Sequence, residues 1–69
     1  TFDRNKEIKK IERDIFELED RLSNLNNELL KEDVYMDINK ANLIKLEIDI
    51  VSKDIEKKTL EWDEITKDM

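Results

Sequence analysis

Basic side chains form the one group in this sequence whose types and spacing could bind a ligand. Four stand near the start of the chain and two in its second half: Lys6, Lys9, Lys10, Arg13, Lys57 and Lys58. Lysine and arginine neutralise backbone phosphates, so one interpretation is a contact with nucleic acid. The other is a solvated, charged helix face, because acidic residues are interleaved and the net charge of −6 repels phosphates at long range. The acidity favours the solvated face, and both interpretations stay open.

The residue types that are missing exclude most other site chemistry. The sequence contains no Gly, Pro, Cys or His. Without His and Cys, the common transition-metal ligands, the usual general base and the thiol nucleophile are lost. Without Gly, there is no phosphate-binding loop and no dinucleotide-binding motif. Carboxylates are numerous, but nothing in the pattern indicates a dry pocket that would organise them. We therefore expect no catalytic residue, no cofactor and no metal site in this chain.

Two heptad runs are the elements that must position these side chains. The first run, here called the first seam, comprises Ile8, Ile11, Ile15, Leu18, Leu22, Leu25 and Leu29. The second seam comprises Ala41, Ile44, Ile48, Val51, Ile55, Lys58, Trp62, Ile65 and Met69. Spacings that alternate between three and four place one narrow apolar stripe on a helix, and such a stripe prefers a partner helix. The sequence therefore predicts two long amphipathic helices.

The heptad phase slips between Leu29 and Ala41, and two explanations fit. One continuous helix could contain a skip, or the chain could turn back on itself. Asp33 and Asp37 favour the turn, since either carboxylate could cap the start of a following helix. Three asparagines just before the slip also weaken the helix there. A turn buries both stripes within one chain, whereas a single rod would need a second chain.

We therefore predict an all-α fold, an antiparallel two-helix coiled-coil hairpin. Its first arm covers about residues 3–31, its tip about 32–37 and its second arm about 38–67. Antiparallel layering places Leu22 opposite Val51 and Ile11 opposite Trp62. Trp62 is then a core anchor near the open end of the hairpin. Lys58 either extends its ammonium out of the seam into water or helps to fix the register.

Four apolar residues around the slip lie off both seams. They are Leu30, Val34, Tyr35 and Ile38. We expect them to close a small apolar plug at the tip, with the Tyr35 hydroxyl in water.

Two short motifs, one at the tip and one near the end of the second arm, resemble a known family. They are Glu32-Asp33-Val34-Tyr35 and Leu60-Glu61-Trp62-Asp63-Glu64-Ile65. Together with the heptads, they make the chain similar to the C-terminal coiled-coil domain of ABC-F ATPases, the Uup-like group of soluble ATP-binding-cassette proteins. In that family the tip typically reads Asp-Pro-x-x-Tyr, and the second arm ends in a Trp-Glu-Glu-Leu-like motif. The present tip contains no proline.

The resemblance implies a non-catalytic interaction module attached to a larger ATPase. The parent would be a cytoplasmic tandem ATPase that acts on ribosomes in translation or antibiotic protection, with ATP and Mg²⁺ bound upstream. Partners implied for the module are the ATPase core, the ribosome or nucleic acid, including DNA. A start at Thr1 is in keeping with a piece of a longer protein. No apolar run is long enough to cross a bilayer, so we expect no membrane partner.

A purely structural or oligomerising coiled coil with no ATPase parent is the alternative function. A two-helix hairpin of this length is marginally stable, and dimerisation into a four-helix assembly would add to its core. Five apolar residues outside the seams are either scattered on the surface or form a second contact face: Phe16, Leu43, Leu46, Ile50 and Leu60. A homodimer is therefore also open.

Overall fold

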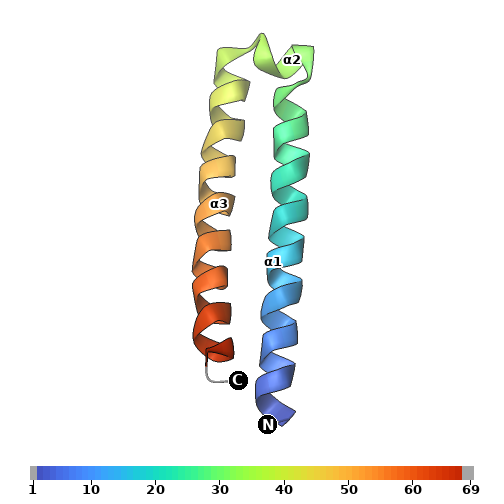
Figure 1. Cartoon of the computed structure of the whole chain (residues 1–69). Helices are drawn as coiled ribbons and strands as arrows, with labels where there is room; N and C mark the ends of the chain where they lie inside the picture. Colours follow the sequence, from blue (N-terminus) through green and yellow to red (C-terminus); the bar gives the residue numbers. More distant parts are fainter. Residues whose placement is uncertain (1, 68–69) are drawn as a thin grey trace.

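The computed structural model describes residues 2–67, and this range contains three α-helices. They are α1 (Phe2–Leu29), α2 (Glu32–Tyr35) and α3 (Ile38–Thr66). The two long helices lie side by side and run in opposite directions, and α2 joins them at the end farthest from the start of α1 (Figure 1). No strand occurs in the described part of the chain, so the prediction of an all-α fold is confirmed.

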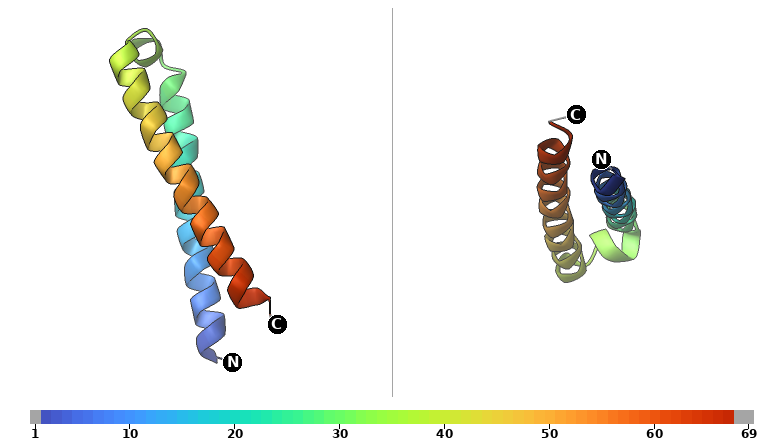
Figure 2. Two further views of the ribbon diagram at one scale, coloured as in Figure 1. Left: turned by 90° about the vertical axis from the view of Figure 1, so that its left-hand side faces the viewer. Right: turned by 90° about the horizontal axis from the view of Figure 1, so that it is seen from below.

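The molecule is a narrow rod. Its principal extents are 51 × 14 × 12 Å. The radius of gyration is 15.8 Å, against about 11 Å for a compact domain of the same length. In the turned views, α3 crosses α1 at an angle and no third layer covers either helix (Figure 2). Over most of its length, each long helix in the described range therefore has only the other long helix on which to bury an apolar face.

The core is the strip where the two seams meet. The buried seam side chains are Ile8, Ile11, Leu25, Ala41 and Val51, and Val34 at the tip is buried as well. Every other seam residue within residues 2–67 is half-buried, and Met69 lies outside the described residues. The five apolar residues off the seams, from Phe16 to Leu60, are all exposed. The alternating spacing thus identified which face of each long helix packs.

The chain reverses without any residue of positive φ in the described range. Two residues of extended backbone flank the short α2: Lys31, with φ −73° and ψ 135°, and Asp37, with φ −107° and ψ 105°. Between them, Tyr35 N–H donates to the Lys31 carbonyl at 2.9 Å, and Met36 N–H donates to the Glu32 carbonyl at 3.0 Å. Since neither hinge needs the left-handed region, the turn requires no glycine.

The sequence offers Asp33 and Asp37 as capping residues, and the prediction is confirmed for Asp37, which caps α3. Its carboxylate oxygen Oδ1 accepts from the backbone N–H of Asn39 at 3.0 Å and of Lys40 at 3.3 Å. The prediction is wrong for Asp33, because Asp33 lies inside α2. The residue before α2 is Lys31, whose side chain makes no capping hydrogen bond.

The apolar plug at the tip is smaller than predicted. Val34 is buried, whereas Leu30, Tyr35 and Ile38 are exposed. A four-residue helix presents one face to the arms, and successive residues point about 100° apart around its axis. Val34 occupies the inward face, so its neighbour Tyr35 points away. The prediction that Tyr35 helps to plug the tip is therefore wrong.

Replacing Asp37 with alanine is expected to lower the free energy of unfolding by about 1 kcal/mol, because two N–H groups of the first turn of α3 lose their acceptor. Urea titration followed by far-ultraviolet circular dichroism measures this change. Asp33→Ala is the matched control and should change stability by less than about 0.5 kcal/mol. Equal losses in the two variants would contradict the capping role.

Candidate functional site

Four exposed cations share one face of α1 at the open end of the rod. They are Lys6, Lys9, Lys10 and Arg13, here called the basic face. Residues spaced by three and four lie one above another on a helix, so these side chains project together. They line a pocket together with Asp3 and Glu7. Residues 3–13 contain five basic and three acidic residues, a net charge of +2 in a chain whose total is −6.

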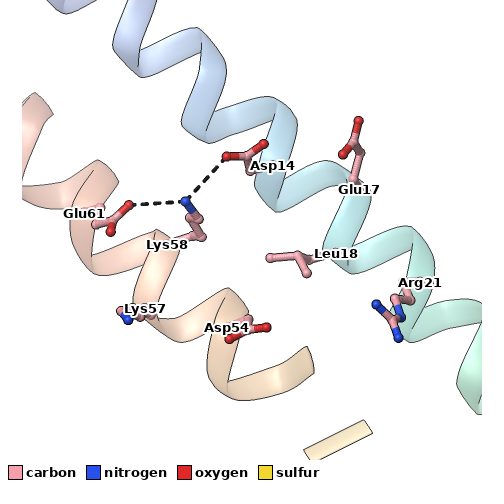
Figure 3. Close-up of a pocket in the computed structure, with 8 residues that line it drawn as sticks. All are labelled: Asp14, Glu17, Leu18, Arg21, Asp54, Lys57, Lys58 and Glu61. Atoms are coloured by element: carbon pink, nitrogen blue, oxygen red, sulfur yellow. Dashed lines mark ion pairs between the residues drawn. The ribbon is translucent and has the colours of Figure 1, made fainter. Parts of the chain in front are cut away.

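Lys57 and Lys58 lie in a different pocket, between α1 and α3 (Figure 3). Its lining is mixed in charge and consists of Asp14, Glu17, Leu18, Arg21, Asp54, Lys57, Lys58 and Glu61. The two pockets share no lining residue. The six predicted nucleic-acid contacts are therefore divided into a group of four on α1 and a group of two on α3.

Lys58 is held by two carboxylates. Its Nζ lies 3.5 Å from Asp14 Oδ2 across the helix interface and 3.6 Å from Glu61 Oε2 on its own helix. Figure 3 shows the ammonium directed at both groups. The side chain is 35% exposed, so each pair is worth at most about 1 kcal/mol after solvent screening. The Lys58 ammonium therefore lies outside the apolar seam, next to Asp14 on α1. A phosphate that bound Lys58 would have to compete with both carboxylates.

Trp62 is half-buried near the open end and makes a second polar link between the helices. Its indole Nε1–H donates to Glu12 Oε2 at 3.2 Å. A third link joins Arg21 to Glu47 at 3.9 Å. The α1 members of the three links follow one another along the chain as Glu12, Asp14 and Arg21. Their α3 partners, Trp62, Lys58 and Glu47, follow in the reverse order, as expected for antiparallel helices. From the sequence, Glu12 and Asp14 count only among the acidic residues interleaved with the basic ones, although their places beside Ile11 and Ile15 could have indicated partners across the interface.

Two kinds of site are absent from the residues that the structure describes. No group of acidic side chains within residues 2–67 could hold a metal ion. Over the same range, no helix combines the length and the apolar character needed to cross a membrane.

Comparison with known proteins identifies a family. Residues 1–67 match the model of the ABC transporter C-terminal domain. Neither the curated proteins nor the solved structures gave a significant match. This match indicates an accessory module of an ABC protein. Because the match spans all but the last two residues, the chain belongs to the family of ABC transporter C-terminal domains.

Proposed function

We propose that the chain is the C-terminal interaction module of an ABC-F-type ATPase and binds nucleic acid, free or in the ribosome, through its basic face. The observation that supports this is the basic face itself, four exposed cations on one side of α1. It lies at the open end of the rod, where the chain would continue toward an upstream ATPase. Membership of the ABC family and the two motifs at Tyr35 and Trp62 support the ATPase parent.

The stiff support for this contact would be an antiparallel coiled-coil hairpin. The alternating seams, half-buried or buried throughout the described range, are typical of knobs-into-holes packing. ATP and Mg²⁺ would be bound by the ATPase core in the cytoplasm, since this chain has no glycine with which to build a phosphate loop. The module's task is therefore recognition and positioning.

Lys57 and Lys58 are poorer candidates for the same contact. Lys58 is paired with Asp14 and Glu61, and the surrounding pocket also contains Glu17 and Asp54. Carboxylates next to an ammonium repel an approaching phosphate. The basic face has fewer acidic neighbours, and we assign the contact to it alone.

Lys9→Glu combined with Lys10→Glu tests the assignment. At about 50 mM salt, we expect weak binding of duplex DNA and of a ribosomal RNA fragment, and the double variant should raise Kd at least about tenfold. Fluorescence anisotropy at several salt concentrations measures Kd and its salt dependence. The slope of log Kd against the logarithm of the salt concentration should become shallower by about two, because two phosphate contacts are lost.

Lys40→Glu combined with Lys45→Glu is the matched control. Both residues are exposed on α3, and the double change alters net charge equally. It should change Kd less than about threefold, since long-range repulsion alone is affected. Equal losses in the two double variants, or tight binding that Lys9→Glu plus Lys10→Glu leaves unchanged, would overturn the assignment. A purely structural coiled coil would then be the better description.

The ATPase parent has its own test. The coding sequence upstream of Thr1 should contain an ATP-binding cassette that ends shortly before this chain. A different upstream domain would overturn the ABC-F assignment. The assignment of nucleic-acid binding to the basic face would not be affected, because it depends on the Kd measurements alone.

A further inference from the structure

The reversal between α1 and α3 exposes four large apolar side chains. They are Leu30 (76% exposed), Tyr35 (56%), Met36 (73%) and Ile38 (72%), here called the tip surface. All four fall between residues 30 and 38, at the end of the rod opposite the basic face (Figure 1). Single exposed apolar residues are common, but large ones gathered in one place are typical of interaction sites.

The tip surface is not needed to form the turn. Backbone hydrogen bonds around α2, the carboxylate cap of Asp37 and the buried Val34 hold the reversal. Side chains that are more than half exposed add little to the core, yet they lower solubility. Their presence at the far end of a rod is better explained by a partner than by folding.

The charge around the tip surface indicates the chemistry of that partner. Residues 28–38 contain four acidic residues and one lysine, a net charge of −3. The lysine, Lys31, is paired with Glu28 at 3.2 Å, and Asp37 caps α3. Glu32 and Asp33 are exposed and make no ion pair within the described residues. Phosphates are repelled here, and cationic side chains are attracted.

We propose that the tip surface docks a basic amphipathic helix of another protein. Its apolar stripe would cover Leu30, Met36 and Ile38, and its lysines or arginines would face Glu32 and Asp33. A second copy of the chain is a poorer occupant, because two tips bring like charges together and the basic face carries no apolar side chain. The area is small, so Kd should be about 10–100 μM.

The test uses a fluorescent helical peptide of about 14 residues with the repeat Leu-Lys-Lys-Leu-Leu-Lys-Leu. The same peptide with Glu for every Lys is the charge control. Fluorescence anisotropy measures Kd, and NMR maps the amide chemical-shift changes along the chain. We expect the lysine peptide alone to bind, with shift changes concentrated in residues 30–40 and absent from the basic face.

Two pairs of variants separate the tip surface from general attraction. Leu30→Ser plus Met36→Ser should raise Kd at least about fivefold. Leu43→Ser plus Leu60→Ser, at two positions on α3 that are also more than half exposed, should change Kd less than about twofold. Glu32→Gln plus Asp33→Asn should weaken binding more than the matched pair Glu56→Gln plus Asp63→Asn. Circular dichroism verifies that each variant is folded.

Three outcomes would overturn this inference. Equal losses in the tip and control variants would show non-specific attraction to an acidic chain. Shift changes at residues 30–40 on adding duplex DNA would make the tip a nucleic-acid site. Self-association that Leu30→Ser plus Met36→Ser abolishes would make a second copy the occupant. The nucleic-acid proposal depends on Lys9 and Lys10, so the two proposals can fail separately.

Discussion

Replacing Val51 with aspartate is expected to unfold most of the chain at room temperature. Val51 is the most deeply buried of the described side chains, at 2% exposure, in the middle of the contact between α1 and α3. An unpaired carboxylate at such a position should cost about 3 kcal/mol or more. A hairpin with a single layer of core side chains has little stability to spare. Far-ultraviolet circular dichroism and urea titration measure the loss of helix.

Ile50→Asp is the matched control, because Ile50 is the preceding residue and is 52% exposed. It introduces the same charge into the same turn of α3 without entering the seam. Its effect should stay within about 0.5 kcal/mol. If both variants lost helix equally, the cause would be added negative charge or helix propensity, and the core assignment of Val51 would be wrong.

Replacing Trp62 with alanine should have the second-largest effect, a loss of about 2–3 kcal/mol. Removing a fully buried tryptophan costs about 3–5 kcal/mol, and Trp62 is only half-buried. The ring is the largest side chain near the open end, where no turn ties the two helices together. Urea titration by circular dichroism gives the change in stability, and amide exchange should increase first at the open end.

Two further variants measure separately what the packing of the Trp62 ring and its hydrogen bond to Glu12 contribute to stability. Trp62→Phe keeps an aromatic ring but loses the donor to Glu12, and Glu12→Ala removes the acceptor. Each should cost about 1 kcal/mol or less, because the bond is exposed to solvent. A Trp62→Phe loss as large as that of Trp62→Ala would show that the hydrogen bond, and not the ring, holds the open end.

The helices and their packed faces could be predicted because the relevant signals are local. Seam positions such as Ile11, Leu25 and Val51 repeat every three and four residues, and this spacing defines one face of a helix whatever it packs against. The capping carboxylate of Asp37 was recognisable for the same reason. Asp33 offered an equal local signal and proved to lie inside α2. Which of two nearby carboxylates caps a helix depends on where the backbone becomes extended.

The candidate sites were only partly predictable. The four cations of the basic face share a helix face by their spacing alone. Antiparallel layering predicts that Lys57 and Lys58 return near these cations, but the two lysines line a different pocket. The carboxylates of Asp14 and Glu12 became partners of Lys58 and Trp62 only when the helices packed.

By itself, the sequence determined that the chain forms two long helices with one apolar stripe each, because heptad spacing and the absence of glycine and proline act within single turns of the backbone. Only the tertiary structure decided which groups meet across the stripes, as with Glu12 and Trp62, which are 50 positions apart. It also decided that Val34 faces inward at the reversal while Leu30, Tyr35 and Ile38 face water. The reason is physical: heptad layering predicts which seam residues lie opposite one another, whereas the polar partners beside the seams and the direction of a four-residue turn depend on how the helices pack.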